Sequence, residues 1–292
     1  MKSHLSVLLF VFAVFTGPFS FPVSAELFRG PISAALGGTG RAGLESLEAA
    51  FLNPALIPLL SDMQITGYYQ DGYSAERAHR TAYGVGAVDN SEGVWIPGSL
   101  HYLQLHDWGR IPGRSDSELW QAALGKRFGE HLSFGISGYR LVSEFQGAPS
   151  ATQWNFSLGS LWMIREQLGV AYVLDNVARP GSDVPAGLRE DLNHALGVFW
   201  GVKGIIQVRM DIVRQERFNP DHKLAYMIGL ESLSTEFFII RLGFKRDELR
   251  DEKIWSAGFG FNGPRLRVDY AVQKYQEGDA GALHTVDLRV PF

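Results

Sequence analysis

A cluster of glycines near the N-terminus is the first pattern in this 292-residue sequence that could do chemistry. Gly38 to Gly43 satisfies G-x-G-x-x-G, the spacing with which dinucleotide-binding proteins bring backbone N–H groups close to a pyrophosphate. That chemistry requires a strand before the glycines and a βαβ unit around them. Here an apolar leader precedes them and alternating segments follow, so we interpret them as flexible backbone and expect no nucleotide.

Patterns for nucleophilic catalysis or metal binding are equally sparse. There is no G-x-S-x-G elbow and no H-E-x-x-H pair. Ser133 or Ser137 with His131 could form the Ser–His pair of a membrane phospholipase, but small residues on one face of a strand usually just line a lumen. With no cysteine and eight scattered histidines, we expect no enzyme, no cofactor and no metal site.

Charged residues that alternate with apolar ones are the third pattern. They belong to the late segments of the chain and comprise Arg209, Asp211, Arg241, Lys245, Arg265, Arg267, Asp269, Asp287 and Arg289. On a lipid-facing surface each Arg or Lys would cost roughly 2–4 kcal/mol at the membrane midplane, so this face is predicted to point into a lumen. There it could form a structural ladder of ion pairs, or a polar pathway that coordinates a substrate.

The elements that position these residues follow from the dominant period of two after residue 62. We predict fourteen strands of roughly 8 to 14 residues, the length that a tilted membrane strand needs. They start near Met63, His79, Val94, Glu118, His131, Ala151, Gln167, Asp191, Ile205, His222, Phe237, Glu252, Arg265 and Leu283. A soluble sandwich would show the same alternation, but tight turns that alternate with longer loops are typical of a transmembrane antiparallel β-barrel.

Three further features support a barrel in a membrane. Seven Trp, ten Tyr and nineteen Phe suit aromatic girdles at the membrane interfaces. The near-neutral charge balance without a basic run argues against nucleic acid as a partner. No later stretch has the roughly twenty apolar residues of a transmembrane helix, and a closed barrel is the other structure that pairs all backbone groups in lipid.

The last predicted strand ends on an aromatic residue. Val286, Leu288, Val290 and Phe292 share one face, and Phe292 is the last residue of the sequence. This pattern resembles the signal that the outer-membrane insertion machinery recognises, so that machinery is an expected partner. An even number of strands also predicts that both chain ends lie on the periplasmic side.

The first 25 residues are predicted to be a secretory signal peptide. Lys2 supplies the positive start, Leu5 to Phe15 is apolar, and Val23-Ser24-Ala25 has the small-x-small pattern of a cleavage site. A transmembrane helix would need about twenty apolar residues, and without cysteine a lipoprotein anchor is impossible. We therefore expect a signal peptide at 1–25, a segment inside the lumen at 26–62, and a barrel at 63–292.

The segment before the first strand is rich in Gly and Ala and carries short amphipathic pieces. Its motif resembles the hatch of the FadL-like outer-membrane transporters and of the related PorV-type proteins of type IX secretion. The residues that carry the resemblance are Gly38, Gly40, Glu45, Glu48, Asn53, Pro54 and Ala55. The resemblance implies a fourteen-stranded barrel whose lumen is plugged by this segment.

Pro97 and Gly98 interrupt the predicted third strand between Trp95 and Leu100. Proline removes a donor from the ladder of hydrogen bonds, and glycine permits a bend. In FadL-like transporters a kink in the third strand opens a lateral window to the membrane, so the resemblance makes Pro97 and Gly98 a candidate lateral opening. The alternative is that two short strand pieces flank an ordinary bulge.

The sequence therefore predicts an outer-membrane protein of a Gram-negative bacterium, in contact with membrane lipid. The leading hypothesis is passive uptake of hydrophobic or amphipathic small molecules past the segment in the lumen. The alternative is a non-transporting, PorV-type barrel that acts as a scaffold or shuttle for proteins of a secretion or surface-assembly system. The short predicted loops favour the alternative, and a lumen blocked by ion pairs would favour it further.

Overall fold

The computed structural model describes residues 28–43, 46–60, 62–73, 79–111, 113–145, 148–179, 181, 184, 189–202, 205–216, 221–234, 237–276 and 281–292. The expected signal peptide at 1–25 lies outside the described residues, and so does Glu45.

Alternation of apolar and polar residues produces fourteen strands, as predicted. They are β1 (Asp62–Tyr73), β2 (His79–Asn90), β3 (Gly98–Ile111), β4 (Gly113–Phe128), β5 (Leu132–Phe145), β6 (Ala148–Arg165), β7 (Leu168–Asp175), β8 (Asn193–Val202), β9 (Ile206–Gln215), β10 (Leu224–Leu233), β11 (Phe238–Asp247), β12 (Glu252–Asn262), β13 (Arg267–Tyr275) and β14 (Ala282–Pro291).

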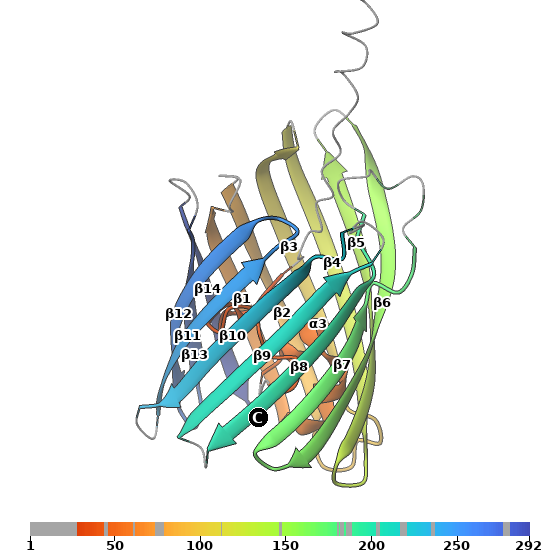
Figure 1. Cartoon of the computed structure of the whole chain (residues 1–292). Coiled ribbons are helices and arrows are strands. Elements are labelled where there is room, and N and C mark those ends of the chain that lie inside the picture. Colours follow the sequence, from red (N-terminus) through yellow and green to blue (C-terminus); the bar gives the residue numbers. More distant parts are fainter. Residues whose placement is uncertain are drawn as a thin grey trace, which may run out of the picture.

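The strands close into one antiparallel barrel (Figure 1). Each strand pairs with its neighbours in the sequence, and β14 pairs with β1 from Gln64↔Pro291 to Gly72↔Leu283. Closure leaves no sheet edge, so every strand finds hydrogen-bond partners on both sides without water.

The barrel has two different rims. The turn rim carries the connections from even-numbered to odd-numbered strands and the end of β14, while the loop rim carries the other seven connections. Asp62 and Phe292, the two ends of the barrel, lie together at the turn rim, where the Phe292 N–H donates to the Met63 carbonyl at 2.9 Å. The described residues begin inside the lumen at Phe28, and the periplasmic location of both chain ends stays a prediction.

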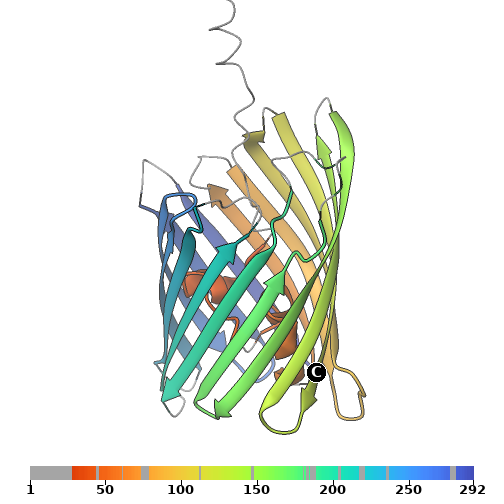
Figure 2. The same ribbon diagram turned by 45° about the vertical axis from the view of Figure 1, so that its right-hand side comes forward.

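Two strands are longer than the predicted 8 to 14 residues. β3 to β6 contain 14, 16, 14 and 18 residues and rise beyond their neighbours at the loop rim (Figures 1 and 2). The fourth strand, predicted to start near Glu118, begins at Gly113, and β3 continues to Ile111, so no long loop joins them. Ser, Asp and Gly disfavour strands intrinsically, but cross-strand pairing such as Leu105↔Ser117 overrides that preference.

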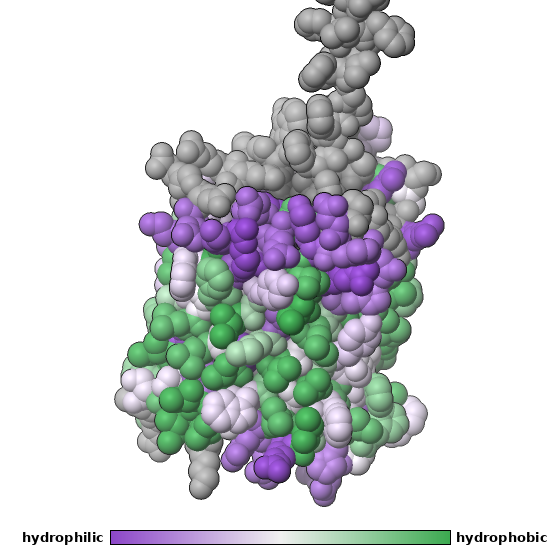
Figure 3. Space-filling view, viewed as in Figure 1, coloured by the Kyte–Doolittle hydropathy of each residue, from purple (hydrophilic) through white to green (hydrophobic). Residues whose placement is uncertain are grey.

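The outer surface carries a broad apolar band (Figure 3). Side chains such as Ile240, Leu242 and Phe259 are about half exposed on alternate positions of their strands. The tryptophan side chains that the structure describes are all exposed, as aromatic girdles require: Trp95, Trp120, Trp154, Trp162, Trp200 and Trp255. A polar belt borders this band below the loop rim in Figure 3, which is the surface of a barrel that spans a membrane.

The lumen contains the N-terminal segment, residues 28–60 (Figure 2). It folds into three short pieces, α2 (Pro31–Ala35), α3 (Ala49–Leu52) and the 3₁₀ helix η1 (Pro54–Leu59). α2 packs on β11 to β14, whereas η1 packs on β2 to β6. Among the helices that the structure describes, none is long and apolar enough to cross a membrane.

Glycines in the wall make room for this segment. Gly125, Gly135 and Gly159 are directly paired on β4, β5 and β6. A Cβ at Gly135 would lie 2.3 Å from the Pro54 carbonyl carbon, and one at Gly125 would lie 2.6 Å from the Pro54 oxygen. Only residues without a side chain allow the backbone to approach this closely, so the wall is shaped to fit the segment.

Candidate functional site

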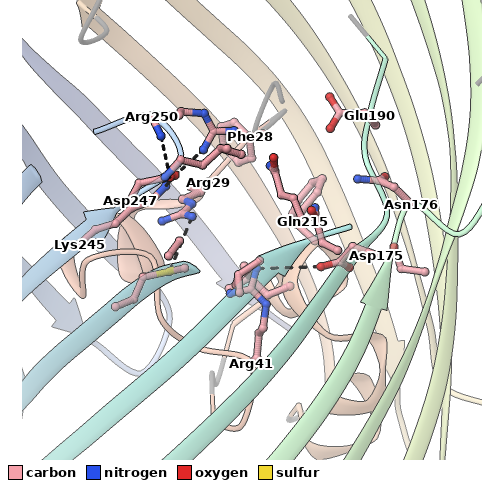
Figure 4. A pocket seen from close by; sticks show the side chains of 18 of the residues that line it. Phe28, Arg29, Arg41, Asp175, Asn176, Glu190, Gln215, Lys245, Asp247 and Arg250 are labelled. Atoms are coloured by element: carbon pink, nitrogen blue, oxygen red, sulfur yellow. Dashed lines mark hydrogen bonds and ion pairs between the residues drawn. The ribbon is translucent and has the colours of Figure 1, made fainter. Parts of the chain in front are cut away.

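A cavity of about 130 Å³ lies between the N-terminal segment and the loop rim (Figure 4). Its floor is formed by the segment itself, and its walls come from β4 to β11 and their connections. The floor residues are Phe28, Arg29, Arg41, Phe51 and Leu52.

The cavity has an apolar side. Leu119 and Tyr139 from β4 and β5 face Phe28 and Phe51 of the segment. Phe28 and Phe51 are 5.5 Å apart between ring centroids, in an edge-to-face arrangement, which aromatic rings favour. This side of the cavity can accept a ring or a short hydrocarbon chain.

Aromatic residues of the wall extend this apolar side. Tyr68 of β1 lies 5.3 Å from Phe28, and His101 of β3 lies 4.8 Å from Phe51 between ring centroids. Sequence reasoning missed this cluster, because its four members lie on separate parts of the chain. The signal available was that Tyr68 and His101 occupy inward positions of their strands.

Charged side chains also line the cavity, and Figure 4 shows one group of them beside Phe28 and another around Arg41. In one, Asp247 at the end of β11 accepts from Arg250 at 2.5 Å and lies 3.6 Å from the Lys245 ammonium. In the other, the Arg41 guanidinium lies 4.0 Å from Asp175. The lining of the cavity thus combines apolar and charged side chains.

Arg29 also lines the cavity and is 7% exposed. Burial, followed by repulsion from the Arg41 guanidinium, lowers the pKa of Arg29 from 12.5 to about 9. One of its terminal nitrogens approaches the Met227 sulfur at 4.0 Å. Arg29 therefore lies against the Met227 side chain of β10 and forms part of the floor.

Asp211 of β9 fastens the glycine-rich turn of the segment. Its Oδ2 accepts from the backbone N–H groups of Gly40 and Arg41 at 3.1 and 3.2 Å, and from the Arg41 guanidinium at 3.1 Å. Gly38 and Gly40 have positive φ angles of 91° and 140°, which glycine adopts readily. The G-x-G spacing thus serves a tight turn after α2, and a carboxylate occupies its N–H groups.

Glu48 caps α2 from within the same segment. Its carboxyl accepts from the backbone N–H groups of Ile32 and Ser33 at 2.8 and 2.9 Å. These are donors of the first helical turn, which no helical carbonyl can satisfy. Glu48 is 1% exposed, and burial raises its pKa from 4.5 to about 7.

The Asn53-Pro54-Ala55 motif is an anchoring turn. The Asn53 amide donates to the Arg41 carbonyl at 2.7 Å and to the Ser160 carbonyl of β6 at 3.3 Å, and its oxygen accepts from the Ala55 N–H at 3.0 Å. Asparagine caps helices in this way, and proline suits the first position of η1. These bonds join two parts of the segment to the wall.

Six charged residues form an alternating ladder across the lumen face of β9 to β14. In order they are Arg209, Glu231, Arg241, Asp269, Arg289 and Asp287. Arg209 lies 3.4 Å from Glu231, which lies 2.6 Å from Arg241. Arg241 reaches Asp269 across β12 because Gly260 leaves the space open. The ladder runs on the turn-rim side of α2.

The predicted lumen charges mostly point inward. Seven of the nine are buried, namely Arg209, Asp211, Arg241, Lys245, Asp269, Asp287 and Arg289. Arg267 is half-buried at the start of β13. Arg265 is a correction, because β13 starts two residues later than predicted and leaves this side chain exposed in the turn.

Pro97 is not inside a strand. β3 begins at Gly98, so Pro97 closes the preceding turn, and its carbonyl accepts from the Gly125 N–H at 3.0 Å. The predicted break within the third strand is therefore wrong, since β3 pairs with β2 and β4 from Gly98 onwards. The lateral opening at Pro97 and Gly98 stays a prediction without that kink to support it.

The remaining predicted residues lie apart from the cavity. Val286, Leu288, Val290 and Phe292 occupy alternate, outward positions at the end of the barrel, and their recognition by the insertion machinery stays a prediction. Ser133 donates to the Ala55 carbonyl at 2.6 Å, whereas His131 is exposed and bonds the Met163 carbonyl. The suggested Ser–His pair is thus not assembled.

The barrel is closed, its outer surface is apolar, and its own N-terminal segment fills the lumen. This chain is therefore an integral membrane β-barrel protein.

No family model and no curated protein matches its sequence. Three solved structures place its fold more closely. The CymD monoaromatic hydrocarbon channel is similar with a TM-score of 0.75 and 12% identity, over 92% of this chain and 98% of that one.

The Ralstonia pickettii toluene transporter TbuX has a TM-score of 0.65 and 13% identity, over 94% of this chain and 100% of that one. A Pseudomonas aeruginosa FadL homologue has a TM-score of 0.63 and 12% identity, over 90% and 98%. This chain therefore has the fold of FadL-like outer-membrane barrels, as its N-terminal motif predicted.

Proposed function

We propose that this protein is a passive channel in the outer membrane of a Gram-negative bacterium, which takes up small hydrophobic or amphipathic molecules. The observation that carries the proposal is the cavity behind the loop rim, whose lining combines the apolar side chains of Phe28, Phe51 and Leu119 with charged groups. Ligand sites commonly combine an apolar surface with a few polar groups in this way. The similar structures described as hydrocarbon or toluene transporters support it.

The size of the cavity narrows the solute. At about 130 Å³ it is comparable to the ~150 Å³ cavity that holds one benzene molecule in an engineered protein. We infer that the solute is compact, with one ring or a short chain. We also propose that residues 26–62 act as a hatch, which Gly38, Gly40, Glu48, Asn53, Pro54 and Ala55 hold in place.

The PorV-type alternative predicts a lumen blocked by ion pairs. The ladder from Arg209 to Asp287 meets part of that prediction, but it covers only β9 to β14. We therefore keep the non-transporting scaffold as the second candidate function. Its specific expectation is a protein partner that binds the intact barrel with no effect on solute flux.

The test uses purified protein in vesicles whose outer leaflet is lipopolysaccharide, because that leaflet resists apolar solutes. We expect faster entry of a neutral monoaromatic compound than in protein-free vesicles, with no gain for a disaccharide. Deletion of residues 26–58 should increase entry of both, since it empties the lumen. Equal monoaromatic entry with and without protein would contradict the channel and favour the scaffold.

A further inference from the structure

The two sides of the lumen differ in buried charge. Among the side chains that the structure describes on β2 to β6, none of the fully buried ones is charged. On β9 to β14 nine are: Arg209, Asp211, Glu231, Arg241, Lys245, Asp247, Asp269, Asp287 and Arg289. The N-terminal segment separates these two sides.

Part of a contiguous apolar cluster lies between the segment and β2 to β6, where Gln121 and Ser133 also donate to the Ala50 and Ala55 carbonyls at 2.7 and 2.6 Å. We call this part of the cluster the apolar column; it includes Phe28, Phe51, Leu52, Leu56, Ile57, Leu60, Val88, Leu103, Leu119, Ala123, Leu141 and Leu161. Phe28, Phe51, Leu52 and Leu119 also line the cavity. The column thus begins at the cavity.

The column reaches the turn rim. Val88 lies two residues before the end of β2, and Asn90 at that end donates to the Pro58 carbonyl at 3.2 Å and also to the Leu60 carbonyl. Between these ends lie Leu103 of β3 and Ala123 of β4, both no more than 1% exposed. Apolar contacts therefore connect the cavity with the opposite rim.

A solute meets a different barrier on the other side. There α2 packs on β11 to β14, and the ladder closes the space beyond it. A neutral solute that separates Arg241 from Asp269 would leave buried charges uncompensated, which is strongly unfavourable. In the column the same solute takes the place of an apolar side chain and makes apolar contacts with the remaining ones. Such contacts are not directional, so they are readily replaced.

We propose that solutes cross the lumen along the apolar column, between the N-terminal segment and β2 to β6, and that the ladder keeps the β9 to β14 side closed. This inference rests on the proposed uptake function. The solutes that pass through the column are neutral and narrow. A solute that carries a charge is retained at the cavity, because the column offers it no buried counter-ion among the described side chains.

Two alanines provide a matched test of the route. Ala123 of β4 and Ala271 of β13 are 1% and 0% exposed, and both lie at inward positions under the segment. Ala123 belongs to the column, whereas Ala271 packs with Ala34 and Ala35 of α2. Ala123→Phe and Ala271→Phe add the same volume to opposite sides.

In the lipopolysaccharide vesicles, Ala123→Phe should lower entry of the monoaromatic compound about tenfold relative to wild type. Ala271→Phe should leave entry within about twofold. A larger loss with Ala271→Phe would overturn the route. Folding of each variant is checked by the heat-dependent shift of barrel mobility on gels.

Leu103→Ala decides the question if Ala123→Phe does not fold, because it widens the column instead of filling it. Entry should rise several-fold, whereas unchanged entry would overturn the route. Failure of the proposed function is a separate result, since wild-type protein would then show no entry above protein-free vesicles. A charged benzoate used as the second solute should remain excluded in wild type and in Leu103→Ala.

Discussion

The lumen walls of β2–β6 and of β9–β14 hold the same N-terminal segment but differ in buried charge. Paired glycines let the segment approach both walls: Gly125, Gly135 and Gly159 on β4 to β6, and Gly229 and Gly243 on β10 and β11. On β4 to β6 the other contacts are apolar or neutral hydrogen bonds, such as Ser133 to the Ala55 carbonyl. On β9 to β14 a charged group takes part, such as Asp211 with the N–H groups of Gly40 and Arg41. Both walls show the same apolar band to the outside.

This difference is the basis of the proposed route, in which one wall holds the segment and the other lets a solute pass. Charged pairs in a low-dielectric space are costly to separate, so the β9–β14 side holds its geometry. Apolar contacts yield more easily because another apolar group can replace them. The four predictions below test this comparison, from the largest expected effect to the smallest.

Asp269→Ala should be the most destabilising change, by about 3–5 kcal/mol, because it leaves Arg241 and Arg289 buried without their shared carboxylate. Urea unfolding in detergent, followed by tryptophan fluorescence, measures the free energy. Ser137→Ala on the uncharged side is the control and should cost less than about 1 kcal/mol. Similar losses for both variants would show that the two walls do not differ.

Glu48 should make attachment of the segment depend on pH. The pKa of Glu48 in the folded protein is about 7, above the ordinary value of 4.5. Its contribution to the free energy of unfolding is therefore complete below pH 4.5 and is lost as the pH rises through 7. Over this range the free energy of unfolding should fall by roughly 3 kcal/mol. Glu48→Gln should flatten the stability profile between these pH values.

The control for this profile is Glu166→Gln, which changes an exposed carboxyl in the β6–β7 turn. It should keep the wild-type dependence on pH, measured as the midpoint of thermal unfolding. If Glu48→Gln also kept it, the capping carboxyl would not be the source.

Gly135→Ala should cost about 1–3 kcal/mol, because its Cβ would lie 2.3 Å from the Pro54 backbone and the segment must shift. Gly138→Ala on the same strand is the control. Its Cβ would meet nothing closer than the Asn155 oxygen at 3.7 Å, so we expect a change within about 0.5 kcal/mol. Protease cleavage near Pro54 in Gly135→Ala alone would locate the shift.

Arg265→Ala should have the smallest effect, within about 0.5 kcal/mol, because the side chain is exposed in the turn before β13. Arg289→Ala provides the contrast, since that residue is buried in the ladder. A large loss of stability with Arg265→Ala in the same unfolding assay would contradict this exposed location. It would indicate that the side chain lies in the lumen, as the sequence pattern predicted.

Much of the fold could be predicted from the sequence by itself. The period of two, the tight turns and the strand lengths determine a closed barrel, because lipid offers no partner for an unpaired backbone group. The same period assigned Arg209, Asp211, Arg241 and Asp269 to the lumen, since a charge facing lipid is unfavourable. The Asn53-Pro54-Ala55 motif predicted that the N-terminal segment lies in the lumen.

Only the tertiary structure decided how these residues combine. The length of β3 and β4 depends on pairing such as Leu105↔Ser117, and local composition at Ser115 and Asp116 opposes it. The ion pair between Arg241 and Asp269 depends on the space that Gly260 leaves open on β12, the strand between them. The aromatic cluster of Phe28, Phe51, Tyr68 and His101 and the cavity beside it arise from contacts between distant parts of the chain. Periodicity specifies which face a side chain occupies, but which neighbours it meets there depends on register and closure.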